Sequence, residues 1–242
     1  MIIILYKKYN IIIYMDINEF KINEFKILSS ILIIGSNVSN KENIICLLIN
    51  HFKKNIPVGI IVNDDLCEYE SLNKLCNKTK KNSVFYVHDK YKDEIIDKLL
   101  FRQQAIINKN TVKEHKMNTN SLLILNNCIK SLSDNISIKE IIYNSQCYNI
   151  EFILAIDNVL SENKNIINQF DYIIVLAGES ISNIENIYEY VKDEIDTFDI
   201  FLKMYKEFSK DNNVIIIDNN KKCKKIYWMT LQKIIKLNFN LI

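Results

Sequence analysis

The sequence predicts an α/β fold with a mainly parallel sheet and helices on both faces. Short continuous apolar runs recur along the chain, and such runs are typical of strands that are buried on both faces. Longer segments between these runs carry apolar residues at helical spacing. Because parallel strands can be joined only by long crossovers, this alternation favours a parallel sheet over an antiparallel one.

The first half of the chain begins this alternation. The apolar run at 31–34 is followed by a helical pattern over 41–54, which Pro57 ends. We expect further strands at 58–62, 84–87 and 122–125, a helix at 91–104, a loop or short helix at 63–81, and a polar, mobile loop at 108–120.

The second half continues the same pattern. We expect strands at 150–156, 171–176 and 214–217, helices at 138–143, 184–192 and 198–208, a turn or linker helix at 166–167, and a strand or helix at 227–229. No internal repeat is evident. The division that we expect is an N-terminal extension at 1–19 and a single domain at 20–242.

The N-terminal extension holds two apolar runs, at 2–5 and 11–14, that are separated by Lys7 and Lys8. These runs are too short and broken for a membrane span, and they lack the pattern of a signal peptide. We therefore expect no membrane association. Met15 is an alternative start of translation, since a more regular pattern begins after it.

Composition narrows the class of protein. Apolar residues make up 48% of the 242 residues and charged residues 25%, which indicates a globular protein rather than a disordered one. The net charge of +2 is too small to imply nucleic-acid or membrane binding by itself. The cysteines form no C-x-x-C pair and the histidines are scattered, so we expect a reduced, cytosolic protein without a disulfide framework or a metal site.

The strand at 31–34 leads into a candidate phosphate-binding loop. A strand, a glycine turn, a lysine and a helix follow one another, as in the motif G-x-x-x-x-G-K-[ST]. The candidate nucleotide-binding residues are Gly35, Ser36, Asn37, Val38, Ser39, Asn40, Lys41 and Glu42. The alternative is an ordinary turn between a strand and a helix, with one glycine and a solvent-exposed lysine.

Two departures from this motif weaken the loop. Asn40 stands at the second glycine, where a side chain hinders the approach of backbone N–H groups to phosphate. Glu42 replaces the hydroxyl that should reach Mg²⁺, and its carboxylate would repel phosphate. Asn40 suits a helix cap and Glu42 suits a first helical turn. We therefore expect the loop to close its helix with these side chains instead of with phosphate.

Other candidate site residues follow strands, because ligands of such sheets bind at the carboxyl ends of the strands. Asn126 and Asn127 follow one strand and Asp157 follows another. A working NTPase would carry acids at the first of these ends, one for Mg²⁺ and one to activate water. Asparagine carries no charge and cannot act as a base.

The order of the segments over roughly residues 20–230 resembles one family. The segment at 122–128 stands where that family has a strand ending in Asp-Asp-Cys, and the segment at 143–150 is similar to one that reads Asn-Gly-Arg-His-Tyr-Asn-Ile. The segments at 56–62, 91–103, 171–176, 188–190 and 198–201 and the pair at 227–228 continue the match. The family is the genome-packaging ATPases of poxviruses and giant viruses, in the HerA/FtsK superfamily.

The resemblance implies a P-loop NTPase-like fold of the RecA/FtsK type. It also implies ATP-driven translocation of DNA into a capsid by a ring of subunits, with ATP and Mg²⁺ as cofactors if the loop is still functional. The implied location is the virus factory in the host cytoplasm, or the virion.

The departures from the family all remove groups that handle nucleotide. Amides replace both acids at Asn126 and Asn127, Gln146 stands at an arginine, and Asp157 stands at a glutamine. An arginine finger alone is worth about 10³–10⁵ in kcat. The hypothesis is therefore a catalytically degenerate homologue, a pseudo-ATPase that acts by binding, either as a homo-oligomer or in a ring with an active paralogue.

Two alternatives stay open. The first is a slow but active packaging ATPase in which Asp157 or Glu42 supplies the missing carboxylate. The second is a nucleotide-independent DNA-binding or structural protein, in which lysine pairs contact the phosphates of double-stranded DNA. These pairs are Lys80-Lys81, Lys221-Lys222 and Lys224-Lys225.

Overall fold

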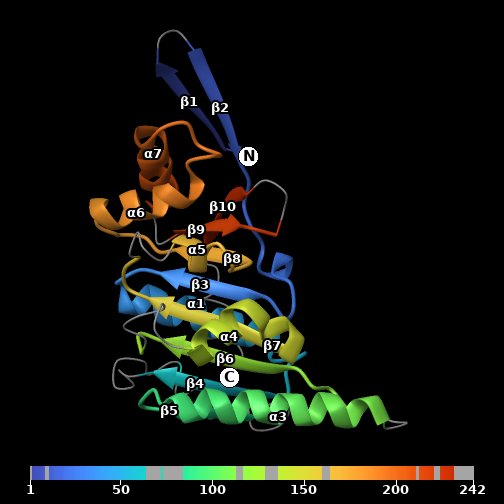
Figure 1. Cartoon of the computed structure of the whole chain (residues 1–242). Helices are drawn as coiled ribbons and strands as arrows, with labels where there is room; N and C mark the ends of the chain where they lie inside the picture. Colours follow the sequence, from blue (N-terminus) through green and yellow to red (C-terminus); the bar gives the residue numbers. More distant parts are fainter. Residues whose placement is uncertain are drawn as a thin grey trace, which may run out of the picture.

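The computed structural model describes residues 2–8, 11–63, 72, 84–112, 117–128, 136–159, 164–210, 213–220 and 224–231. Its centre is one large sheet (Figure 1). From edge to edge the strands are β10 (Lys225–Thr230), β9 (Asn213–Asp218), β8 (Tyr172–Val175), β3 (Ser30–Ile34), β7 (Ile150–Ile156), β6 (Ser121–Asn126), β4 (Val58–Asn63) and β5 (Val84–His88). Strands β8 to β5 are mutually parallel, and only β9 runs the other way. The predicted α/β fold with a mainly parallel sheet is confirmed.

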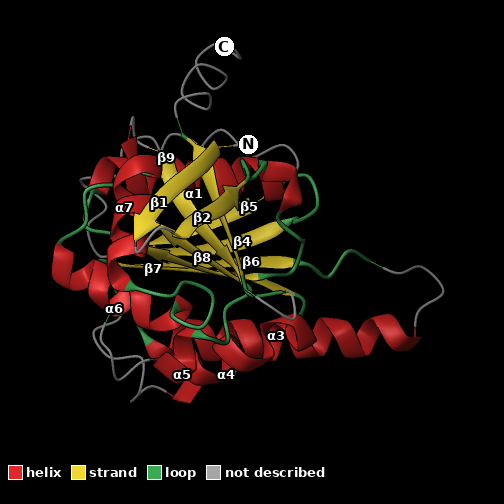
Figure 2. Cartoon of the chain, turned by 90° about the horizontal axis from the view of Figure 1, so that it is seen from above, coloured by secondary structure: helices red, strands yellow, loops and turns green. Residues whose placement is uncertain are grey.

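Helices cover both faces of this sheet. They are α1 (Val38–Phe52), α3 (Asp93–Val112), α4 (Ile136–Asn144), α5 (Lys164–Ile167), α6 (Ile181–Val191) and α7 (Phe198–Phe208), with short 3-10 helices η1 (Ile22–Glu24) and η3 (Ser145–Tyr148). Figure 2 shows α1 on one side of the sheet and α3 to α6 on the other. The predicted cover on both faces is thus confirmed.

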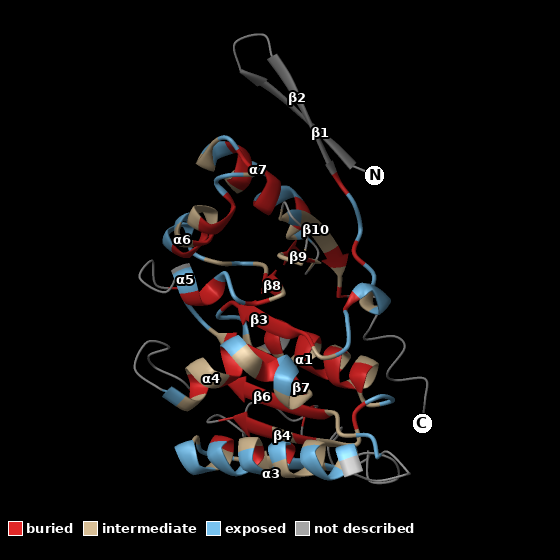
Figure 3. Cartoon of the chain, turned by 45° about the vertical axis from the view of Figure 1, so that its right-hand side comes forward, coloured by how far each residue is buried: buried red, intermediate tan, exposed pale blue. Residues whose placement is uncertain are grey.

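The central strand β3 explains why its apolar run is continuous. Successive side chains point to opposite faces, so each face of a doubly covered strand must be apolar. Leu32 and Ile34 belong to the core beneath α3 to α7, whereas Ile31 and Ile33 pack in the core beneath α1. All five residues of β3 are buried, and Figure 3 shows the same burial in β7 and β6.

The N-terminal segment forms a separate hairpin and then joins the sheet. Strands β1 (Ile2–Lys8) and β2 (Ile11–Ile17) pair antiparallel in a two-stranded sheet of their own, which extends away from the large sheet (Figure 1). Ile17 is buried in the core. The backbone N–H of Phe20 then donates to the carbonyl of Trp228 at 2.8 Å, so this segment lies along β10. The division at residue 19 and the start at Met15 remain predictions.

One element differs from its prediction. The polarity of the segment at 108–120 predicts a loop, but α3 continues to Val112. The residues at 108–111 are polar because this part of α3 is exposed or half-buried (Figure 3). A helix that is covered on one side only keeps a polar outer face. The segment at 63–81 lies outside the described residues apart from Asn63 and Leu72.

None of the described helices combines the length and the apolar character that crossing a bilayer needs.

Candidate functional site

The site begins where β3 ends, at Gly35. Its backbone has φ +155°, and an added Cβ would lie 2.6 Å from the Cβ of Leu176. No side chain fits at that distance, so this position requires glycine. The strand, glycine and helix of the predicted loop are therefore present, with α1 starting at Val38.

The helix α1 is capped by Asn37. The Asn37 side chain accepts a hydrogen bond from the backbone N–H of Asn40 at 2.9 Å. The expectation that a side chain of the loop closes the helix is confirmed, but the prediction of Asn40 as the cap was wrong, because the helix begins earlier than its apolar pattern indicates. Glu42 lies beyond the first turn, and its carboxylate accepts from the backbone N–H of Leu72 at 3.0 Å.

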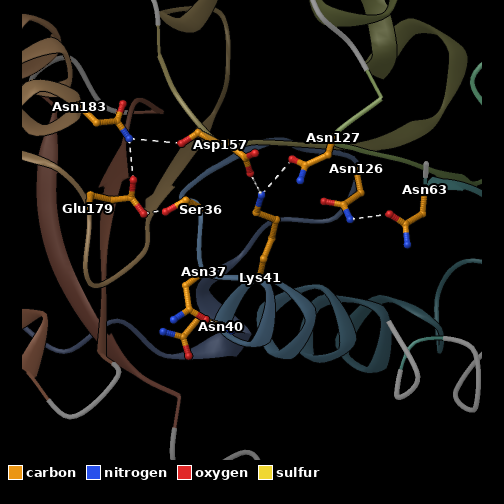
Figure 4. A network of polar contacts seen from close by, with 10 residues as sticks. All are labelled: Ser36, Asn37, Asn40, Lys41, Asn63, Asn126, Asn127, Asp157, Glu179 and Asn183. Atoms are coloured by element: carbon orange, nitrogen blue, oxygen red, sulfur yellow. Dashed lines mark hydrogen bonds and ion pairs between the residues drawn. The ribbon is translucent and has the colours of Figure 1, made fainter. Parts of the chain in front are cut away.

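Lys41 is fully buried, which excludes the interpretation as a surface lysine. Its ammonium forms an ion pair with the carboxylate of Asp157. It also donates to the side-chain oxygen of Asn127 at 2.9 Å. Figure 4 shows both contacts, which join the ends of β6 and β7 to α1. The fold therefore brings together three of the predicted site residues.

Asn126 is close by but differs from Asn127 in its partners. Its side-chain nitrogen donates to the side-chain oxygen of Asn63 at 2.8 Å, and both residues are fully buried. Within the described part of the chain, Asn126 Oδ1 and Asn63 Nδ2 have no hydrogen-bond partner. Exchanging oxygen and nitrogen in both amides would still leave one donor and one acceptor unpaired.

Two residues that the sequence reasoning missed complete the site. Glu179 accepts from the backbone N–H of Ser36 at 2.9 Å, and Asn183 donates to the other oxygen of Glu179 at 2.7 Å. Asn183 also donates to the carbonyl of Asp157 at 3.3 Å. Both residues follow β8, a neighbour of β3, so the carboxyl end of the strand at 171–176 was the available signal.

Gln146 is not part of this site. It precedes β7, whereas Asp157 follows that strand, and a strand of seven residues spans roughly 20 Å. Its side-chain nitrogen donates to a carboxylate oxygen of Asp171 at 3.2 Å, at the amino ends of the strands. The remaining loop residues are Val38, whose half-buried side chain packs against the α1 core, and Ser39, whose backbone lies in α1.

The residues present do not fit a magnesium–nucleotide complex. Asn126 and Asn127 supply no carboxylate at the end of β6, and Glu42 is directed to Leu72. The carboxylate of Asp157, which lies beside Lys41, is already paired with it. The described ranges also contain no group of three or more histidine, cysteine or acidic side chains that could hold a metal ion.

Comparisons with known proteins show the same fold in viral and secretion ATPases. No protein-family model matches the chain. The DNA-packaging ATPase B204 of Sulfolobus turreted icosahedral virus aligns over 83% of this chain and 97% of its own, with a TM-score of 0.56 and 19% identity. The cytoplasmic domain of the type VII secretion ATPase EccC of Thermomonospora curvata aligns over 90% of this chain and 27% of its own, with a TM-score of 0.56 and 11% identity.

Two relatives in sequence are uncharacterized viral proteins. Protein L437 of Acanthamoeba polyphaga mimivirus is 24% identical over 217 residues, which cover 87% of this chain and 74% of that protein. Protein 075L of Invertebrate iridescent virus 6 is 24% identical over 198 residues, which cover 79% of this chain and 71% of that protein. The chain thus has the fold of P-loop ATPases, and it has viral relatives in sequence.

Proposed function

We propose that this chain is a catalytically degenerate relative of viral DNA-packaging ATPases that acts in genome packaging or virion assembly. The observation that carries the proposal is the burial of Lys41 and its pairing with residues of the same chain. The lysine that would bind phosphate is buried, and it is ion-paired with Asp157 and hydrogen-bonded to Asn127 of the same chain. A phosphate would have to displace these partners before it could use the lysine.

The missing bases support the same proposal. Deprotonation of the attacking water needs a base, and amides cannot take a proton. Asn126 and Asn127 stand at the strand end where the resemblance implies two acids. The likeness in fold to B204 supports a role related to packaging, and the viral relatives support a location in the host cytoplasm or the virion.

A slow ATPase is the second candidate, and the exposure of Asp157 favours it. The side chain of Asp157 is 48% exposed although it is paired with Lys41. A carboxylate in that position is accessible to water and stands beside the loop. If a ligand drew Lys41 away, Asp157 would become available as a base.

Hydrolysis of Mg-ATP by three proteins separates these two functions: the wild type, Lys41→Met and Asp157→Asn. Methionine approximates the volume of the buried lysine stem, so the first variant removes charge with little loss of packing. A degenerate protein gives the same background rate in all three. A wild-type rate that falls in both variants would contradict degeneracy and establish the slow ATPase.

The proposed partners are further subunits of a ring, either copies of this chain or an active paralogue, and double-stranded DNA. Sedimentation with the paralogue tests the ring. Titration with duplex DNA at several salt concentrations tests the second partner, since each phosphate contact steepens the salt dependence of the affinity. DNA affinity without any association between subunits would instead favour the nucleotide-independent DNA-binding protein.

A further inference from the structure

The loop after β8 brings a carboxylate to the beginning of α1. Glu179 Oε1 lies 2.9 Å from the backbone nitrogen of Ser36, and it would lie 2.8 Å from a Cβ built on Gly35. The glutamate oxygen is therefore packed directly over the glycine turn. Figure 4 shows Glu179 on one side of the turn and Asp157 above Lys41.

The carboxylates of Glu179 and Asp157 make the contacts that a bound oxyanion such as phosphate would make. Backbone N–H groups at a helix start and a nearby lysine form a binding site for phosphate. Here the N–H of Ser36 donates to Glu179, and the ammonium of Lys41 contacts Asp157. A carboxylate near the start of a helix is also favoured by the helix dipole.

The loop that carries Glu179 is held by two further side chains. The hydroxyl of Tyr205 accepts from the backbone N–H of Glu179 at 2.9 Å and donates to the carbonyl of Leu176 at 2.8 Å. Burial raises the pKa of Tyr205, so this hydroxyl keeps its proton for donation. Asn183 holds the second carboxylate oxygen. The position of Glu179 is therefore defined from both its backbone and its side chain.

Gly178 gives this loop a means to move. Its backbone has φ +86°, a conformation that glycine adopts readily, and no atom lies within 4 Å of an added Cβ. The turn is thus permissive and open to solvent on that side. Rotation at Gly178 would withdraw Glu179 and break its backbone hydrogen bond with Tyr205, while Tyr205 still donates to the carbonyl of Leu176.

We infer that the loop retains an oxyanion site and that Glu179 is its internal occupant, in competition with a polyphosphate anion. This inference deepens the proposed function, on which it rests, by naming the group that keeps phosphate out of the loop. If Glu179 occupies the site for nine-tenths of the time, it weakens the apparent affinity for the anion about tenfold. Replacing the carboxylate by an amide leaves Ser36 only a weaker, uncharged acceptor, which recovers most of that factor, and it also removes a charge that repels the anion.

Calorimetry with inorganic pyrophosphate tests the inference on the full chain. The Glu179→Gln variant should bind at least about tenfold more tightly than the wild type. The exposed residue Glu185, on the same helix as Asn183, supplies the matched control Glu185→Gln, which should bind like the wild type. Adding Lys41→Met to Glu179→Gln should abolish the gain. Equal affinity of Glu179→Gln and Glu185→Gln would overturn the inference.

A second measurement uses the wild type and does not depend on the folding of a variant. The amide resonance of Ser36 in the wild type should shift as pyrophosphate is added, because the anion replaces Glu179 as the acceptor of this N–H. A Ser36 resonance that stays in place as pyrophosphate saturates the protein would contradict the inference. Hydrolysis remains the test of the proposed function. Anion binding by Glu179→Gln without ATP turnover supports both the proposed degeneracy and the inference about Glu179. ATP turnover in the wild type would contradict only the degeneracy.

Discussion

The two ends of the sheet bury charge in opposite ways. At the carboxyl ends, Lys41 is buried with Asp157 as its counterion. At the amino ends, Glu151 is fully buried at the start of β7, and its carboxyl group accepts from the backbone N–H of Ser29 at 3.0 Å and from its hydroxyl at 2.9 Å. Among the ion pairs of the described residues, none involves Glu151.

This difference shows two solutions to the cost of burying an ion. At the carboxyl ends, the carboxylate of Asp157 beside Lys41 offsets the cost of burying the ammonium group. Glu151 is instead favoured in its neutral form: burial raises its pKa to about 8, against the opposing effect of the hydrogen bonds from Ser29. Burial of Lys41 at the carboxyl ends therefore depends on a partner residue, whereas burial of Glu151 at the amino ends depends on a bound proton.

The largest effect is expected for Lys41→Ala. It removes a fully buried side chain and leaves a cavity, so the free energy of unfolding should fall by about 2–4 kcal/mol. Lys41→Met fills most of that volume and should cost only about 1 kcal/mol, because Asp157 is half exposed and can be hydrated alone. Urea unfolding measures both. Equal losses in the two variants would mean that the charge, and not the packing, stabilises this end.

Glu151→Gln should alter how stability depends on pH. The folded-state pKa of about 8 lies above the ordinary value of 4.5, so the folded protein keeps a proton that the unfolded chain releases. Wild-type stability attributable to Glu151 is therefore present below about pH 4.5 and is lost as pH rises to about 8. Glutamine cannot ionise, and its amide can still bond with Ser29. The stability of the variant should therefore rise relative to that of the wild type between about pH 4.5 and pH 8, by a few kcal/mol.

Urea unfolding of both proteins between pH 5 and pH 8 measures this difference. Parallel curves for the wild type and Glu151→Gln would show that Glu151 is ionised in the folded protein, and the contrast between the two ends of the sheet would disappear.

A smaller effect is expected for Asn37→Ala at the carboxyl end. It removes the cap that accepts from Asn40, which should cost about 1 kcal/mol. Asn37→Asp keeps an acceptor at the same place and should retain the stability. Thermal unfolding of the wild type and both variants measures these differences in stability. An unchanged melting temperature of Asn37→Ala would show that the backbone N–H of Asn40 finds another acceptor.

The smallest effect is expected for Lys98→Ala, a lysine with an exposed partner. Lys98 and Glu94 are 3.4 Å apart on α3, with 79% and 78% of their side chains exposed. Solvent screens such pairs, so the loss should stay within about 0.5 kcal/mol. A loss comparable with that of Lys41→Ala would show that burial does not distinguish the two lysines.

The fold could be read from the sequence more fully than the site. Strands such as Ile150–Ile156 were predicted residue for residue, because burial on both faces leaves an unbroken apolar run. The pairing of Lys41 with Asp157 could not be foreseen, since it joins residues 116 positions apart whose distance depends on strand order. Glu179 was missed because a single acid after a glycine has no distinguishing local pattern.

The contact between the segment at 18–20 and β10 also bears on how the chain is made. Residues near the beginning of the chain pair with Trp228, which is synthesised about 200 residues later. At about 5–20 residues per second, Phe20 leaves the ribosome roughly 10–40 s before its partner strand. During that interval its aromatic side chain lacks the cover that Tyr227 later provides. The nascent protein is therefore expected to need protection from aggregation, or chaperone assistance, until translation passes β10.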